Sequence, residues 1–193
     1  MDILSWLAEN FDLPILDWIA ANLHCGFLDA VMPWITKLGD AGIFWIALSL
    51  LFIILPRYRK AGLSMGAALL MGLILCNLIL KPLVARIRPY DYQFEHFNVM
   101  IELLIATPHD YSFPSGHTIA SFEAATALLL HNRKLGIPAM VIAVLVAFSR
   151  LYLYVHYPTD VIASMILGVG LAFLGCWLVK KGFDLYETKK ANK

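Results

Sequence analysis

Three short blocks of the chain carry residue types that bind and transfer phosphate groups. The first block is 81–89, in which six residues separate Lys81 from Arg88; the second is Pro-Ser-Gly-His at 114–117; the third is 149–160. Guanidinium groups grip phosphate oxygens in a two-pronged fork, and lysine adds a point charge. An imidazole can attack phosphorus or deliver a proton. The blocks therefore predict an oxyanion site equipped with histidines for phosphoryl transfer.

The residue types and spacings suggest a division of labour. Lys81, Arg88 and Arg150 supply three positive charges. Ser115 and Gly116 stand where a helix is expected to begin, so free backbone N–H groups there would point at an anion.

Two histidines complete the predicted site. His156 lies just before Pro158, a favourable first residue for a helix. Asp160 falls in the first turn of that helix and can reach back to one imidazole nitrogen, which leaves the other free to attack. His117 can then protonate the leaving oxygen.

The composition places these blocks in a membrane protein. Of 193 residues, 60% are hydrophobic and 15% are charged, against about 45–50% and about 25% in ordinary soluble domains. The mean hydropathy is +0.72. A net charge of +1 argues against a nucleic-acid partner, which requires a strong basic excess. The three cysteines show no metal-ligand or disulfide spacing, so no metal or other cofactor is expected.

Apolar runs predict an all-α integral membrane fold, a single domain with a bundle of five to six transmembrane helices. The five clear runs are 41–55, 61–80, 115–130, 135–148 and 161–179. Residues 41–179 are the expected transmembrane core, and 180–193 form a polar tail. The stretch 13–38 is also apolar but carries interrupting polar residues, namely Asp17, His24, Asp29 and Lys37. It is either an interfacial helical segment or a further span.

Charge asymmetry predicts the orientation. With five spans, one side of the membrane holds ten of the fifteen Lys and Arg residues: Arg57, Arg59, Lys60, Arg133, Lys134, Lys180, Lys181, Lys189, Lys190 and Lys193. Positively charged loops stay in the cytoplasm. The C-terminus is therefore expected inside and the three blocks at the outer face. At the N-terminus, Asp2, Glu9 and Asp12 stand where a secretory signal would be positive, so none is expected.

The complete set of blocks resembles the type 2 phosphatidic acid phosphatase family, which also includes the vanadium haloperoxidases. The family pattern of K-x6-RP, PSGH and SR-x5-H-x3-D is present at every fixed position. The resemblance implies that His156 is a nucleophile forming a phosphohistidine, His117 the general acid and then the base for water, and Asp160 the residue that orients His156. It implies no metal, and phosphate binding by Lys81, Arg88, Ser115, Gly116 and Arg150.

The predicted function is hydrolysis of a membrane lipid phosphate or pyrophosphate at the outer face. The outward site, small size and short loops are similar to those of bacterial enzymes acting on undecaprenyl pyrophosphate, the preferred substrate. Phosphatidylglycerophosphate and phosphatidic acid are alternatives. An anion or lipid transporter is the alternative from another class, but few polar residues lie along the bundle. One of these, Glu123, is either functional or an interhelical hydrogen-bond partner of Asn77. The sequence leaves the oligomeric state open.

Overall fold

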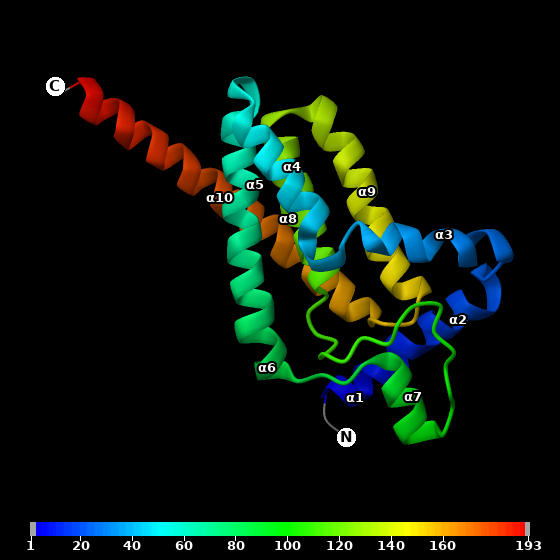
Figure 1. Cartoon of the computed structure of the whole chain (residues 1–193). Coiled ribbons are helices and arrows are strands. Elements are labelled where there is room, and N and C mark those ends of the chain that lie inside the picture. The colour runs from blue at the N-terminus through cyan, green and yellow to red at the C-terminus, as the bar shows by residue number, and fades with distance from the viewer. Residues whose placement is uncertain (1–2, 192–193) are drawn as a thin grey trace.

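A computed structural model describes residues 3–191, and all of their regular structure is helical (Figure 1). Asp2 and Lys193, which entered the charge analysis, lie outside the described residues. The bundle consists of α4 (Ile43–Ile54), α5 (Arg59–Leu73), α8 (Gly116–His131), α9 (Arg133–Tyr152) and α10 (Pro158–Ala191). Shorter helices are α1 (Ile3–Leu7), α2 (Leu13–Leu23), α3 (Gly26–Lys37), α6 (Lys81–Val84) and α7 (Pro89–Phe97). Single π or 3-10 helical stretches link them at Ala8–Asp12, Asp40–Gly42, Pro56–Tyr58 and Ile74–Leu80.

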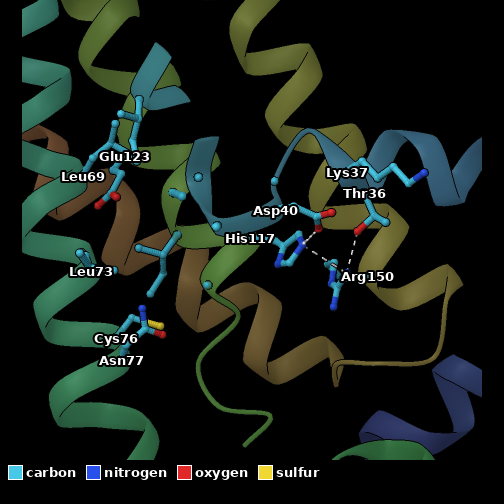
Figure 2. Close-up of a pocket in the computed structure, with 18 of the residues that line it drawn as sticks. Thr36, Lys37, Asp40, Leu69, Leu73, Cys76, Asn77, His117, Glu123 and Arg150 are labelled. Atoms are coloured by element: carbon cyan, nitrogen blue, oxygen red, sulfur yellow. Dashed lines mark hydrogen bonds and ion pairs between the residues drawn. The ribbon is translucent and has the colours of Figure 1, made fainter. Parts of the chain in front are cut away.

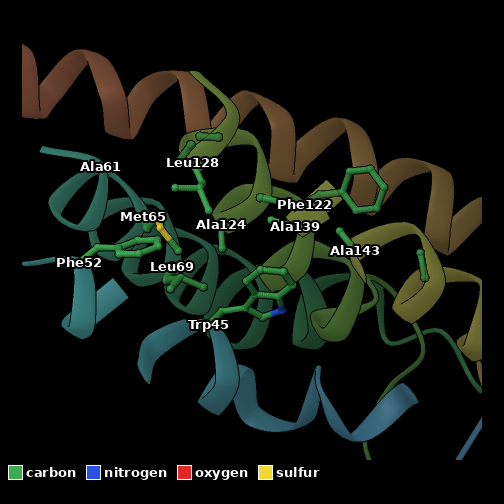
Figure 3. Close-up of a cluster of buried hydrophobic side chains, with 14 of the residues drawn as sticks. Trp45, Phe52, Ala61, Met65, Leu69, Phe122, Ala124, Leu128, Ala139 and Ala143 are labelled. Atoms are coloured by element: carbon green, nitrogen blue, oxygen red, sulfur yellow. The ribbon is translucent and has the colours of Figure 1, made fainter. Parts of the chain in front are cut away.

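Helix α8 is the centre of the bundle because small or apolar residues cover every side of it. It packs against α4, α5, α9 and α10. Three of its alanines, Ala124, Ala125 and Ala127, are fully buried, and Trp45 of α4 fills the space beside them (Figure 3). The Trp45 indole donates a 2.9 Å hydrogen bond to Ser121 Oγ, which satisfies both polar groups inside the core.

Glycines in the neighbouring helices let their backbones come into close contact with α8. A Cβ added to Gly136 of α9 would lie 2.1 Å from the Cα of Leu129. A Cβ added to Gly168 of α10 would lie 3.0 Å from the carbonyl oxygen of Ile119. Small residues at helix interfaces are typical of bundles in lipid, where dispersion contacts replace the hydrophobic driving force.

The structure confirms a helical bundle with several membrane-crossing helices, but not the predicted number of spans. Among the described residues, three segments are long and apolar enough to cross: Pro56–Phe97, Arg133–Tyr152 and Pro158–Ala191. A fourth exists if Gly26–Lys37 and Asp40–Ile54, bent by 42°, form one span. The run predicted at 115–130 became α8, which has 16 residues. Its length of about 24 Å falls short of the roughly 30 Å hydrocarbon thickness.

The last predicted run, 161–179, is the middle of a longer helix. Helix α10 has 34 residues and projects well beyond the bundle at its C-terminal end (Figure 1). The polar tail expected from residue 180 is therefore helical as far as Ala191.

The N-terminal helices cover the end of the bundle where α10 begins. Leu16 of α2 and Met32 of α3 join a second buried cluster with Tyr90 of α7 and the segment 152–157. Helices α2 and α3 have 11 and 12 residues, or about 16–18 Å each, so neither crosses a bilayer alone. The segment instead buries the loop that carries His156.

Candidate active site

The predicted site residues meet at one end of the bundle and come from α6, α8, α9, α10 and the loops before α7, α8 and α10. His117 is in the first turn of α8, Arg150 in the last turn of α9, and His156 in the loop to α10. Six of the eight predicted residues line one cavity of about 990 Å3 (Figure 2). These six are Lys81, Arg88, Gly116, His117, Arg150 and His156. Asp160 and Ser115 lie behind its wall.

The rest of the cavity is mostly apolar. It continues between α4 and α5, where its lining includes Leu50, Ile53, Leu69, Leu70 and Leu73. One end of the cavity is thus lined by cationic and imidazole side chains, and the rest of it is lined mostly by apolar side chains. This shape fits an amphiphile with an anionic head.

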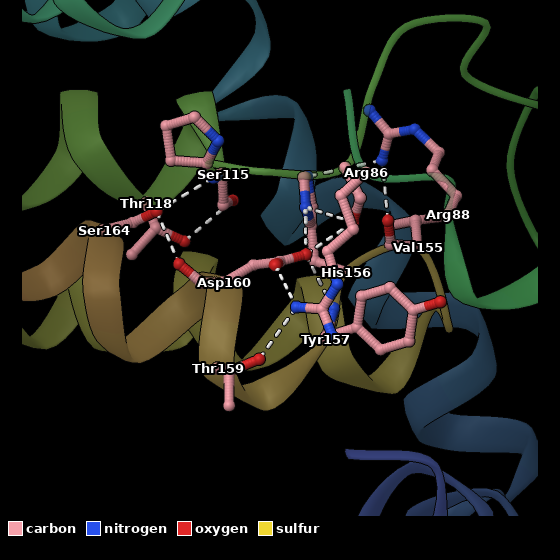
Figure 4. Close-up of polar contacts among 12 residues, drawn as sticks. Arg86, Arg88, Ser115, Thr118, Val155, His156, Tyr157, Thr159, Asp160 and Ser164 are labelled. Atoms are coloured by element: carbon pink, nitrogen blue, oxygen red, sulfur yellow. Dashed lines mark hydrogen bonds and ion pairs between the residues drawn. The ribbon is translucent and has the colours of Figure 1, made fainter. Parts of the chain in front are cut away.

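His156 is buried, with its two ring nitrogens in different surroundings (Figure 4). Nε2 lies 3.4 Å from Arg88 Nη1, and Nδ1 lies 3.6 Å from Asp160 Oδ2. The negative charge of Asp160 favours a proton on Nδ1, which leaves the lone pair of Nε2 for a ligand. Burial and then the nearby Arg88 and Arg150 hold the pKa of His156 well below its ordinary value, so the imidazole is neutral near pH 7.

Asp160 is held by three donors. Oδ2 accepts hydrogen bonds from Ser112 Oγ at 2.5 Å and from the Tyr157 backbone N–H at 3.1 Å. Oδ1 accepts one from Arg86 Nη1 at 2.6 Å. This satisfied carboxylate has one orientation, as its predicted role beside His156 requires.

Two of the predicted phosphate-binding cations already hold a carboxylate. Arg88 donates from Nη2 to Asp110 Oδ1 at 2.5 Å, and Lys81 donates to Asp110 Oδ2. Burial alone would raise the pKa of Asp110, but these two contacts outweigh it and hold that pKa below its usual range. The carboxylate demonstrates that the pair can bind an oxyanion between them.

His117 and Arg150 form the other side of the cationic end. His117 Nε2 lies 2.8 Å from Asp40 Oδ1 and 3.5 Å from Arg150 Nη1. Arg150 Nη1 donates to Thr36 Oγ1 at 2.6 Å. Arg150 Nε has no hydrogen-bond partner within residues 3–191, so the guanidinium retains an unused donor beside the cavity.

One predicted detail is wrong. The backbone N–H of Ser115 was expected to be free for an anion, but it donates to Ser164 Oγ at 2.8 Å. The Ser115 hydroxyl accepts from Thr118 Oγ1 at 3.0 Å, and the residue is fully buried. Gly116, the next residue, does line the cavity. Ser115 therefore supports the start of α8 and does not line the cavity.

Several contacts to the site come from residues that sequence analysis did not select. They are Asp12, Thr36, Asp40, Arg86, Asp110 and Ser112. Of these residues, Arg86 can be found from the sequence by its charge. It is a cation on the acidic side of the membrane, and such a residue needs a nearby anion. In the described part of the chain, no group of three or more metal-ligating side chains is arranged around a common point.

Glu123 lies deeper in the same cavity, away from the histidines (Figure 2). Its side chain is buried against Gly72 of α5, where an added Cβ would lie 2.2 Å from Oε2. Oε2 has no hydrogen-bond partner among the described residues, so the alternative of an interhelical hydrogen bond to a group such as Asn77 does not hold for this oxygen.

Comparison with known proteins agrees with this geometry. A family model described as the PAP2 superfamily matches residues 61–184. The chain is 34% identical over 156 residues to an undecaprenyl-diphosphatase of Sulfolobus acidocaldarius, covering 80% of this chain and 72% of that protein. It is 34% identical over 170 residues to phosphatidylglycerophosphatase B of Bacillus subtilis, covering 82% and 76%.

Solved structures share the fold. A PAP2-type phosphatidylglycerolphosphate phosphatase from Bacillus subtilis superposes with a TM-score of 0.69 at 28% identity, covering 96% of this chain and 88% of that one. The family model begins in α5, ends in α10 and takes in all three motif blocks. As the motifs predicted, this multi-pass membrane protein belongs to the PAP2 superfamily and is a lipid phosphatase.

Proposed function

We propose that this phosphatase converts undecaprenyl pyrophosphate to undecaprenyl phosphate through a phosphohistidine on His156. The observation that carries the proposal is the two-part cavity, with a cationic end at His156 and an apolar channel between α4 and α5. A long polyprenyl chain offers nothing but hydrocarbon to such a channel. Relatives named undecaprenyl-diphosphatase in Sulfolobus acidocaldarius and Bacillus subtilis, at 34% and 30% identity, support this lipid.

The first chemical step joins His156 to phosphorus. Lys81, Arg88 and Arg150 hold the terminal phosphate and offset its charge. His156 Nε2 attacks in line, a P–N bond forms, and the P–O bond to the lipid phosphate breaks. His117 gives its proton to the departing oxygen.

The second step returns the enzyme to its starting state. His117, now neutral, takes a proton from water as that water attacks the phosphohistidine. The P–N bond breaks and inorganic phosphate leaves. Asp160 keeps the His156 proton on Nδ1 through both steps, so Nε2 is the atom that bonds and is released.

We also propose that all five bundle helices cross the membrane with the cationic end outward. Helices α4, α5, α8, α9 and α10 lie side by side in Figure 1. The short α8 is enclosed by the other four, so its ends need not reach the lipid surface. Exposed aromatic side chains on the N-terminal helices, Trp6, Trp18, Phe27 and Trp34, suit an outer interface.

Glu123 favours a second candidate substrate, phosphatidylglycerophosphate. A buried carboxyl with an unpartnered oxygen can bind a polar oxygen of a lipid near its head. Glycerol esters carry such oxygens, whereas a polyprenyl chain does not. A relative and a solved structure, both from Bacillus subtilis and both named as phosphatidylglycerophosphate phosphatases, are consistent with this alternative. Because the chain belongs to a phosphatase family, we do not favour the transporter alternative.

Release of inorganic phosphate from purified protein in detergent tests the proposal. The substrates are undecaprenyl pyrophosphate, phosphatidylglycerophosphate and phosphatidic acid, each assayed with and without a chelator. We expect the highest kcat/KM on undecaprenyl pyrophosphate and full activity in chelator, because three fixed cations balance the phosphate. A tenfold preference for either glycerolipid would reject the proposed substrate, and activity restored only by magnesium would reject the proposed site.

A further inference from the structure

Arg86 is buried between two carboxylates beside the proposed nucleophile. Its Nη1 donates to Asp160 Oδ1 at 2.6 Å, and its Nη2 donates to Asp12 Oδ2 at 2.7 Å. All three side chains are nearly or fully inaccessible to solvent. Figure 4 shows the guanidinium reaching Asp160 and Thr159 at the start of α10.

Arg86 is not placed to bind phosphate. It does not line the cavity, and the Tyr157 ring covers one face of its guanidinium at 3.7 Å from the ring centroid. Its hydrogen bonds run to Asp12, Thr159 and Asp160. Its charge therefore acts on the carboxylates and, through Asp160, on His156.

Asp12 shares this cation and also fixes the start of α10. Its Oδ1 accepts from the Thr159 backbone N–H at 2.9 Å, and its Oδ2 accepts from Thr159 Oγ1 at 2.7 Å. Thr159 is adjacent to Asp160, so Asp12 holds the turn that carries the orienting carboxylate. As a second anion on Arg86, it also weakens the net positive field at Asp160.

Few other groups act on Asp160. The loop 98–115 contributes the Ser112 hydroxyl, and the loop before α10 contributes His156 and the Tyr157 N–H. Arg88 lies on the far side of His156. Arg86 is the one cation in direct contact with Asp160 among the described residues, and Asp12 is the one anion that shares it.

We propose that Arg86 and Asp12 are positioning residues that together set the ionisation of the Asp160–His156 pair. This inference rests on the proposed roles of His156 and Asp160. Arg86 keeps Asp160 ionised inside the protein, while Asp12 limits the positive field so that the His156 lone pair remains a good nucleophile. The N-terminal segment, which lies outside the family match at 61–184, is thereby part of the catalytic apparatus.

Opposite shifts of the pH profile test this proposal. Removing a cation favours protonation of the pair, so Arg86→Gln should move the acid-side midpoint of kcat/KM up by about one pH unit. Removing an anion has the reverse effect, so Asp12→Asn should move the midpoint down. Arg86→Lys keeps the charge and should leave the midpoint near the wild-type value while lowering kcat. The matched controls are Arg133→Gln and Asp184→Asn at the other end of the bundle, which should not shift it.

The outcomes separate this inference from the proposed function. His156→Ala is assayed in parallel with the same lipid phosphate; activity remaining in that variant would reject the proposed mechanism itself. An inactive His156→Ala together with unshifted or same-direction midpoints would reject only the role of Arg86 and Asp12. Thermal unfolding in detergent reports whether each variant folds. If Arg86→Gln does not fold, the Asp12→Asn variant alone tests the proposal. A downward shift of its midpoint supports the proposal, and an upward or absent shift rejects it.

Discussion

Asp40 Oδ1 lies 2.8 Å from Nε2 of His117, and Arg150 Nη1 lies 3.5 Å from the same nitrogen. The proposed proton donor thus stands between an anion and a cation. Burial and the charge of Arg150 disfavour its protonated form, and Asp40 favours it. A bound phosphate would add negative charge on the Arg150 side and so shift this balance toward the imidazolium when the proton is needed.

Asp40→Asn should impair proton donation more than phosphate binding. We expect kcat/KM to fall about tenfold on a lipid phosphate, a fraction of the 10²–10⁴ attributed to general acid catalysis. The loss should be smaller on an activated aryl phosphate, whose leaving group needs no proton. The comparison of the two substrates is the measurement, with Asp91→Asn, on α7, as the control. Equal losses on both substrates would remove Asp40 from this role.

The depressed pKa of His156 predicts the acid side of the pH profile. Burial and nearby cations lower that pKa well below 6.5, and only the neutral imidazole can attack. The nucleophile is therefore present above its depressed pKa and is lost only as the pH falls through it. Plotting kcat/KM against pH should show no decline on crossing pH 6.5 from above. A midpoint at or above 6.5 would contradict the buried, cation-flanked nucleophile.

The motif residues could be predicted from sequence because each block is local. Six residues separate Lys81 from Arg88, and three separate His156 from Asp160, so the chemistry is visible as spacing. Asp40 and Asp12 are different, since they lie 77 and 74 positions from His117 and Arg86. Only the packing of the N-terminal helices on the bundle end brings them together.

The positions of the helices could be predicted from the sequence, but their lengths and depth could not. Apolar runs located all five bundle helices, because burial in lipid or core demands hydrophobic residues. They did not give helix length or depth, since α8 is apolar through enclosure by other helices and α10 continues past its apolar part. Ser115 illustrates the limit at atomic scale, because its N–H partner, Ser164, comes from another helix.

Asp110→Asn should strengthen the binding of phosphate-like anions. Asp110 occupies Lys81 and Arg88, and its lowered pKa keeps it ionised at neutral and mildly acidic pH. Removing this competing charge should lower the inhibition constant of vanadate by about tenfold, or ~1.4 kcal/mol. Glu95→Gln removes an exposed carboxylate of α7 and serves as the control. Weaker vanadate binding in Asp110→Asn would show instead that this carboxylate holds the two cations in place.

Glu123→Leu separates the two candidate substrates. A buried carboxyl oxygen without a partner costs about 1–3 kcal/mol, so its removal should raise the thermal unfolding temperature in detergent. Turnover of undecaprenyl pyrophosphate should change less than about twofold, because its polyprenyl chain has no polar group for Glu123 to bind. Glu123→Gln is the control of similar shape. A loss confined to phosphatidylglycerophosphate would point to the glycerolipid. A large loss on undecaprenyl pyrophosphate would show instead that Glu123 acts in the turnover of that substrate.

Labelling of single cysteines tests the orientation. Cys25, Cys76 and Cys176 are replaced, and one cysteine is introduced either at Glu95, near the catalytic end, or at Arg133, the first residue of α9 at the other end. Both positions are exposed in the structure. Positive loops remain cytoplasmic, and Arg133 lies in the basic set. An impermeant maleimide should therefore label Glu95→Cys in intact cells and Arg133→Cys only after lysis. The reverse pattern would place the cationic end in the cytoplasm, and the substrate would then have to reach the enzyme from the inner leaflet.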